Sequence, residues 1–233
     1  MWLSKLLINK VCLNLLMFYA LDLVLYSMTN NLCISILGSA ILTILSLTLL
    51  NSYVHILRRK VKSLKIRVLT LNTIGFKLPV ALSKLGYQDI YVNLMLITPS
   101  LITISSLILN IFRLNIVNLF LMTVMPIALS LIPYVTVKVR LGIGIVGNML
   151  MVSLTLALII KALNDVLGVY LKPYVIFVMT YLATLLGFDL FNLDSLRSHE
   201  GGIYIGGFGV YDALMIIPLI TTSISASLIM LVP

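Results

Sequence analysis

The chain has 233 residues, of which 61% are hydrophobic and only 10% are charged, and its mean hydropathy is +1.16. A soluble domain carries about a quarter charged residues, so too little polar surface exists here to cover a globule in water. A water-soluble enzyme is excluded, and the composition predicts an all-α, multi-spanning membrane protein.

The net charge of +9 is concentrated rather than spread along the chain. Six of the sixteen Lys and Arg residues lie between Arg58 and Arg67, beside a long apolar run. Such a cluster is typical of a cytoplasmic loop, and it is also a candidate contact for anionic lipid headgroups. Nucleic-acid binding would need a folded basic domain, and none is present. We therefore expect a cell-membrane protein whose N-terminus and loop 58–67 are cytoplasmic, with the lipid bilayer as its surroundings.

The N-terminus resembles a signal peptide, because Lys5 and Lys10 precede an apolar run. However, Asp22 falls within the run and no small-residue cleavage site follows it, so we predict a retained first span. Cys12 and Cys33 have no partnering histidines and indicate neither a metal site nor a disulfide framework. No metal and no cofactor are expected.

Eight hydrophobic runs follow one another, separated by short polar segments, and no long linker divides them. Loops this short make consecutive helices antiparallel neighbours in one bundle, so residues 1–233 are predicted to form a single integral membrane domain. The runs cover approximately 11–28, 32–57, 68–86, 90–110, 115–135, 142–163, 173–193 and 203–231.

The third run, 68–86, is a poor lipid-facing helix, because it contains Asn72, Gly75, Lys77 and Pro79. Proline removes a helical hydrogen bond, and the freed carbonyl group needs a partner inside protein or water. We expect a broken or re-entrant segment, so the bundle has seven or eight spans. The positive-inside rule barely separates these topologies. Eight spans place eleven basic residues inside and four outside, and seven spans place twelve inside and three outside. The side of the membrane on which loop 194–202 lies is therefore undetermined.

Three carboxylates fall at membrane depth, where insertion costs about 2.5–3.5 kcal/mol each. Asp22 stands alone in the first span, and we interpret it as a structural residue neutralised by Lys77, Lys84 or Arg113. Asp189 and Asp212 end one run and begin the next. A loop of about nine residues joins these runs in a hairpin, which places both carboxyl groups about 8–15 Å deep on the same side of the bilayer.

A glycine-rich stretch precedes Asp212, with five glycines between residues 201 and 209. Each glycine weakens a helix by about 1 kcal/mol relative to Ala, so this start is expected to be unwound or packed very closely on a neighbour. In either case backbone groups near Asp212 become accessible. Gly206, Gly207, Gly209 and Tyr211 are therefore candidates for substrate or ion access, although helix packing alone also accounts for the glycines.

The segments 185–193 and 205–212 resemble a multi-spanning prokaryotic family known as domain of unknown function 1614. The first motif of its members is Ile-Gly-Ala-Asp-Leu-Leu-Asn-Leu, and this chain has Leu-Gly-Phe-Asp-Leu-Phe-Asn-Leu at that place. The second motif is Gly-Gly-Ala-Gly-x-Phe-Asp-Gly, and this chain has Gly-Gly-Phe-Gly-Val-Tyr-Asp-Ala. Asn72 and Pro79 match the spacing of that family's Asn-x-Gly-Gly-Ala-x-Ile-Pro. The likeness covers roughly residues 68–220 and implies the architecture, not an activity. The high Ile, Leu and Val content with a single Gln, Gln88, suits a thermophilic archaeon.

A more distant resemblance is to the presenilin, signal-peptide-peptidase and prepilin-peptidase group of membrane aspartyl proteases. It rests on one Asp in each of two consecutive helices, the second preceded by Gly-x-Gly. In those enzymes the second Asp directly follows the glycines, whereas Val210 and Tyr211 separate Gly209 from Asp212 here. This offset rotates the carboxylate by about 200° on a regular helix, so the match requires an unwound segment.

Three functions stay open at this point. The first is an intramembrane aspartyl protease-like hydrolase with Asp189 and Asp212 as acid and base, acting on a membrane-protein substrate. The second is a carrier of protons, Na⁺ or a small solute, in which Asn72, Gly75, Pro79 and Asn192 line the site with the same aspartates. The third is a non-catalytic subunit or assembly factor with structural aspartates. No P-loop and no His-Glu-x-x-His motif is present in the sequence.

Overall fold

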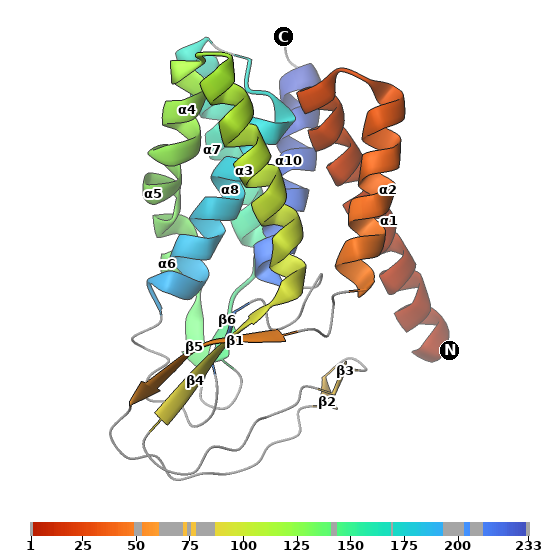
Figure 1. The fold of residues 1–233 in the computed structure, drawn as a ribbon, viewed down its shortest axis with the longest axis vertical. Helices are drawn as coiled ribbons and strands as arrows, with labels where there is room; N and C mark the ends of the chain where they lie inside the picture. Colours follow the sequence, from red (N-terminus) through yellow and green to blue (C-terminus); the bar gives the residue numbers. More distant parts are fainter. Residues whose placement is uncertain are drawn as a thin grey trace.

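The computed structural model describes residues 2–48, 53–60, 72–73, 76–77, 87–140, 144–168, 170–192, 203–205 and 212–231. Within these residues, seven helical rods run between the two ends of one bundle (Figure 1). This confirms the predicted helical bundle. The rods are α1 (Trp2–Thr29), α2 (Leu32–Thr48), α3 (Ile97–Phe112), a broken rod of α4 (Ile116–Thr123), α5 (Met125–Leu129) and α6 (Leu131–Thr136), α7 (Met149–Leu167), α8 (Pro173–Thr184) with its extension η2 (Leu185–Leu190), and α10 (Ala213–Leu231).

Three of these rods are long and apolar enough to cross a membrane: Ile116–Thr136, Met149–Leu167 and Pro173–Leu190. The other apolar helices are shorter, with Leu32–Thr48 and Ile97–Phe112 among them. Many large apolar side chains on the outer faces are exposed, as lipid-facing side chains are. The protein is therefore a membrane protein.

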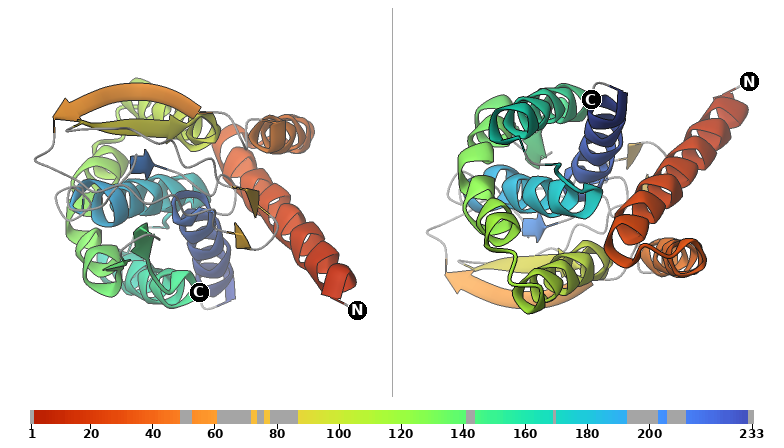
Figure 2. Two further views of the ribbon diagram at one scale, coloured as in Figure 1. Left: turned by 90° about the horizontal axis from the view of Figure 1, so that it is seen from below. Right: turned by 90° about the horizontal axis from the view of Figure 1, so that it is seen from above.

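Helix α8 lies in the middle of the bundle, with the other rods around it (Figure 2). It is apolar on all sides and nearly all its residues are buried, as expected for a helix with no lipid-facing stripe. Helix α10 packs along α8 and α7. Helix α1 runs obliquely along one side, and its N-terminal part projects beyond the bundle.

A three-stranded sheet covers one end of the bundle (Figure 1). It consists of β1 (Tyr53–Lys60), β4 (Tyr87–Asn93) and β7 (Ile203–Ile205), in the order β1-β4-β7. Strands β1 and β4 are antiparallel, whereas β4 and β7 are parallel. In the register of this pair, Arg58 of the basic strand β1 is opposite Asp89 of β4.

These strands shorten two predicted spans. The run 32–57 is helical only to Thr48 and extended from Tyr53, and the run 90–110 becomes helical only after η1 (Leu94–Leu96). The segments concerned are rich in aromatic and β-branched residues, which favour strands, and a hydrophobic run alone does not separate the two structures.

Strands β1 and β4, which flank the third run, pair with each other and therefore lie at the same end of the bundle (Figure 1). The choice between seven and eight spans stays a prediction. Within this segment β2 (Asn72–Thr73) and β3 (Phe76–Lys77) form a two-stranded hairpin, and the other residues of 68–86 lie outside the described ones. The pairing of β7 with β4 also places Ile203–Ile205, between α8 and α10, at the sheet end, where β4 separates it from the basic strand β1.

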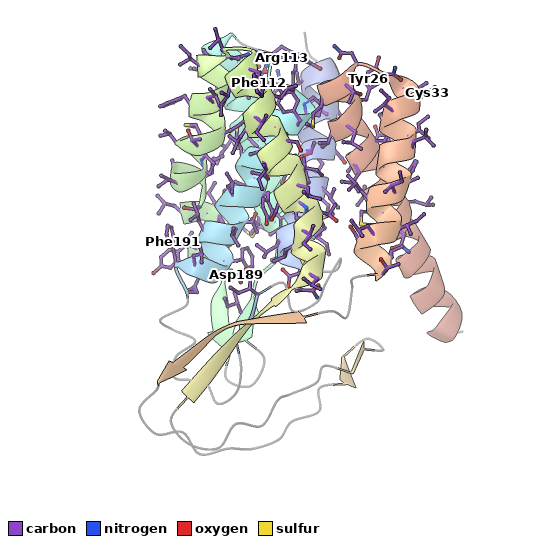
Figure 3. The ribbon with its side chains drawn as sticks, viewed as in Figure 1. Tyr26, Cys33, Phe112, Arg113, Asp189 and Phe191 are labelled. Atoms are coloured by element: carbon purple, nitrogen blue, oxygen red, sulfur yellow. The ribbon has the colours of Figure 1, made fainter. Side chains whose placement is uncertain are left out.

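The opposite end of the bundle is held by a buried polar network. The side-chain oxygen of Asn110 accepts hydrogen bonds from the Tyr174 hydroxyl and from the Asn118 amide, both at 3.1 Å. The Ser27 hydroxyl accepts the backbone N–H of Tyr174 at 3.2 Å. Helices α1, α3, α4 and α8 are thus joined far from the sheet, at the end where Figure 3 labels Arg113.

Candidate functional site

Asp189 lies on a widened helical turn at the sheet end of the central rod (Figure 3). Residues Leu185–Leu190 form the π-helical turn η2, and the Phe191 N–H donates to the Leu186 carbonyl five residues earlier at 2.9 Å. Such turns inside α-helices are rare and occur frequently at functional sites, because the extra residue re-aims the side chains around it.

Two rods approach each other closely within this turn, at Gly187. A methyl group built on Gly187 would lie 2.6 Å from Cγ of Pro133 and 3.1 Å from the backbone N of Tyr134, and closer still to the Ser130 carbonyl oxygen. Only a residue without a side chain allows η2 to pack on α6 in this way. The proline-broken rod α4–α6 therefore determines where Asp189 is placed, two residues after Gly187.

Asn192 forms side-chain hydrogen bonds at the end of the widened turn. Its buried amide donates to the Gly187 carbonyl at 2.8 Å and to the Phe188 carbonyl at 3.1 Å. These carbonyl groups are left without helical partners where the rod ends. Asn192 was predicted to give substrate or ion access, and the structure shows a hydrogen-bonding role for its amide nitrogen.

The Asp189 side chain is half-buried, and its Oδ2 atom is fully buried without a hydrogen-bond partner among the described residues. A buried acceptor without a partner is costly for a charged group and much less so for a neutral one.

Asp212 lies immediately before α10 and caps it. Its Oδ1 atom accepts the Leu214 N–H at 2.9 Å, and its carbonyl oxygen accepts the N–H groups of Met215 and Ile216. The cap gives Asp212 a structural function, and the N–H groups and dipole of the helix start favour its negatively charged form.

The position of Asp212 differs from the sequence expectation in one respect. Asp212 was expected about two to three turns inside a helix, whereas α10 begins only at Ala213 and residues Ile203–Ile205 are extended in β7. The glycines explain this, because a helix start so poor in propensity does not form. Gly206, Gly207, Gly209 and Tyr211 themselves lie outside the described residues.

The two aspartates lie at the same end of two helices that pack on each other. Asp189 is at the end of α8–η2 and Asp212 is immediately before α10, and the charge of Asp212 acts on Asp189. Whether the two carboxyl groups share one site stays a prediction.

Two further residues, Tyr181 and Ser100, have no feature in the sequence that marks them as site candidates. The Tyr181 hydroxyl lies 3.2 Å from the Ser100 hydroxyl of α3, and the Tyr181 ring stacks on Phe177 with centroids 6.4 Å apart. Tyr181 is buried and interacts electrostatically with Asp189. A tyrosine and a serine in apolar runs look like ordinary membrane-helix residues, so their relation to Asp189 is visible only in three dimensions.

The other predicted residues lie apart from this pair or outside the described chain. Asn72 is in the β2–β3 hairpin, which forms a sheet of its own, and Gly75 and Pro79 are not described. Asp22 in α1 has a buried Oδ1 atom without a hydrogen-bond partner, and the described residues include no cation that forms its expected ion pair.

Comparison with known families agrees with the resemblance found in the sequence. Residues 16–224 match the family described as "Protein of unknown function (DUF1614)". The chain belongs to this family. No curated protein and no solved structure matches the chain. These comparisons do not show the distant resemblance to membrane aspartyl proteases.

Proposed function

We propose that this DUF1614 protein is an intramembrane hydrolase that uses Asp189 and Asp212 as an acid–base pair on a peptide bond. The observation that supports the proposal is the position of the two aspartates at the same end of two consecutive rods that pack on each other. Two carboxyl groups in one site share a proton, because both do not ionise readily at close range.

The different surroundings of the two aspartates assign their roles. Asp212, held at the start of α10 by the Leu214 N–H, is the carboxylate and acts as the base. Asp189, with a buried oxygen that lacks a partner, is the protonated acid. Pairs of carboxyl groups in unequal environments divide the work of acid and base in this way.

The reaction follows from these roles. Asp212 takes a proton from water while the water oxygen bonds to the peptide carbonyl carbon, and Asp189 gives its proton to the carbonyl oxygen. The tetrahedral intermediate then loses the C–N bond, and the amine leaves with the proton that Asp212 holds. The second hydroxyl proton returns to Asp189 as the carboxylic acid product forms.

The proposed substrate is an extended segment of a membrane protein. A peptide bond inside a helix is shielded, so cleavage needs an unwound chain and exposed backbone groups on the enzyme. We assign that access to Gly206, Gly207, Gly209 and Tyr211 before Asp212, together with the Asn72–Pro79 segment.

The proposed orientation places the sheet end in the cytoplasm of the cell. Strand β1 and the adjoining chain to Arg67 carry the basic cluster, whereas Arg113, Lys161 and Lys172 lie toward the opposite end. The positive-inside rule then places the aspartate pair near the cytoplasmic surface. The cluster Arg58–Arg67 would contact anionic lipid headgroups there.

The test is a cleavage assay with the full protein in liposomes that contain a library of transmembrane peptides. Wild-type protein should generate new peptide termini, detected by mass spectrometry. Asp189→Asn and Asp212→Asn should each abolish them, and Asp165→Asn on the opposite end should not. Cleavage that survives in either aspartate variant would contradict the proposal.

A second candidate, a carrier of protons or Na⁺, is favoured by one observation in α10. Pro218 lies inside this helix and has no N–H to donate, so the Leu214 carbonyl loses its helical partner one turn from Asp212. Free carbonyl groups beside carboxylates are ligands of cations in carriers. A pH- or Na⁺-sensitive dye inside liposomes distinguishes the two functions, because carrier activity requires flux without any new peptide termini.

A further inference from the structure

Two hydroxyl groups in the middle of α10, those of Thr222 and Ser225, are buried and have no hydrogen-bond partner among the described residues. Both side chains are 0% exposed. Counted from Ala213, Thr222 is the tenth of the nineteen residues of α10, which places it about 13–14 Å from either end of the helix. A buried hydroxyl without a hydrogen bond is costly, so each of the two requires a partner.

Other hydroxyl groups at this level of the bundle bond to their own helix. The Thr180 hydroxyl of α8 donates to a carbonyl one turn earlier at 2.8 Å, and the Ser223 hydroxyl of α10 does the same at 2.9 Å. Thr222 and Ser225 make no such bond within the described chain. Their hydroxyl groups are therefore available to a partner outside α10.

Thr222 and Ser225 share one face of α10, because they are three residues apart. Their Cβ atoms are then about 5–6 Å from each other. Since both side chains are fully buried, this face is on the protein side of α10, which packs along α8, α7 and α1. The two hydroxyl groups thus lie beside each other in the interior of an apolar bundle.

A third polar group lies on the same face, one turn nearer the sheet. Pro218, Thr222 and Ser225 follow the i, i+4, i+7 spacing of a single helix face. Pro218 has no N–H to donate to the Leu214 carbonyl, and this carbonyl points along the axis toward residue 218. A helical side chain covers the turn before its own residue, so the Thr222 side chain lies over the Pro218 turn.

We infer that α10 binds internal water at the Pro218 turn, held by the hydroxyl groups of Thr222 and Ser225 and by the Leu214 carbonyl. Water that bridges two groups spans about 5–6 Å, the length of two hydrogen bonds of about 2.8 Å, which matches the spacing of the two side chains. Two hydroxyl groups and one carbonyl supply the two to four partners that a buried water needs.

The composition of the site selects water rather than a cation. Its groups are two hydroxyls and a carbonyl, with no carboxylate to offset a buried positive charge. In membrane helices, ordered water re-satisfies carbonyl groups that a proline has freed. The water thus replaces the helical hydrogen bond that Pro218 removes. The site is distinct from the proposed active site, because Thr222 is ten residues, about 15 Å, along the chain from Asp212.

The test is solid-state NMR of the full protein in lipid, with magnetisation transferred from water protons to ¹³C-labelled threonine and serine side chains. Thr222→Val and Ser225→Ala identify the two signals by their loss. Transfer to both residues should be fast although they are fully buried. Thr180 is the matched control, since it is equally buried and bonded to its own helix, and it should receive little. Ser225→Ala should slow the transfer to Thr222.

The unfolding midpoint gives a second test, which depends on the sign of the change. Thr222→Val replaces a hydroxyl by a methyl group of similar shape. If water holds the hydroxyl, the variant loses hydrogen bonds and its midpoint should fall. If the hydroxyl has no partner at all, the methyl group removes a penalty and the midpoint should rise. Thr180→Val should change the midpoint less, because the carbonyl groups it releases keep their helical N–H partners.

The outcomes decide the inference without reference to peptide cleavage. Transfer to Thr222 that is no faster than transfer to Thr180 overturns it, and so does a Thr222→Val protein with an unchanged or raised midpoint. A Thr222 signal that shifts when Na⁺ replaces choline in the buffer would show a bound cation and overturn the assignment to water. None of these measurements uses either aspartate, so the inference and the proposed function stand or fail separately.

Discussion

The contact at Gly187 gives the sharpest stability prediction. In Gly187→Ala the new methyl carbon would lie 2.6 Å from Pro133 Cγ and 3.1 Å from the Tyr134 backbone N. Carbon atoms pack at about 3.5–4.0 Å, so η2 and α6 must separate by about 1 Å. Neither a proline ring nor a helix backbone rotates away. Overpacking of this kind costs about 1–3 kcal/mol, and the higher helix propensity of Ala returns at most about 1 kcal/mol.

We expect Gly187→Ala to lower the free energy of unfolding by about 1–3 kcal/mol, measured by reversible unfolding in mixed micelles. Gly38→Ala is the matched control. Its methyl carbon would meet only the end of the Leu25 side chain, at 2.9 Å, and that side chain can move. A Gly187→Ala protein as stable as wild type would refute the account of how η2 is held.

The remaining predictions concern the cap, the end of the widened turn and the network at the opposite end. Asp212→Ala should lower the free energy of unfolding by about 0.5–2 kcal/mol, whereas Asp212→Asn should retain the cap and lose only activity; equal stabilities for the two variants would contradict the cap. Asn192→Ala leaves the Gly187 and Phe188 carbonyl groups unpaired and should cost about 1–3 kcal/mol; an unchanged unfolding midpoint would show that solvent replaces the amide. Asn110→Ala should cost about 1–3 kcal/mol, because it removes the acceptor of both the Tyr174 hydroxyl and the Asn118 amide; a variant as stable as wild type would contradict the stabilising role of this network.

The main features of the fold follow from hydrophobicity and proline chemistry in the sequence. Apolar runs of near-membrane length predict the rods. The prediction from Pro79 and Lys77 that the third run does not cross as a regular helix concerns residues that lie mostly outside the described ones. The glycines before Asp212 predict a helix that starts late, as α10 does at Ala213. These features depend on residues close together in the chain, so they can be predicted from the local sequence.

The strands of the sheet and the widened turn at Asp189 were not predicted, because both depend on distant residues. Tyr53 and its neighbours extend an apolar run without a break, and they become a strand by pairing with residues near Val92. Within the turn η2, Gly187 meets Pro133 of another rod. A glycine two residues before Asp189 is the one local hint of that contact.

Part of the candidate site was visible in the sequence and part was not. Asp189 and Asp212 stand out, because carboxylates in apolar runs are costly. Asn192 was predicted to give substrate or ion access, which stays a prediction, and its amide nitrogen donates to the carbonyl groups of η2. Tyr181 is chemically unremarkable in the sequence, and its link to Ser100 spans 81 positions.

The measurement that tests the central claim most directly is a double-mutant cycle on the two aspartates. The free energy of unfolding is measured for wild type, Asp189→Asn, Asp212→Asn and the double variant, and no substrate is needed. If the carboxyl groups form one coupled site, the effects of the single changes should differ from additivity by more than about 0.5 kcal/mol. Effects that add within about 0.3 kcal/mol would show two independent aspartates, and the acid–base pair would be contradicted.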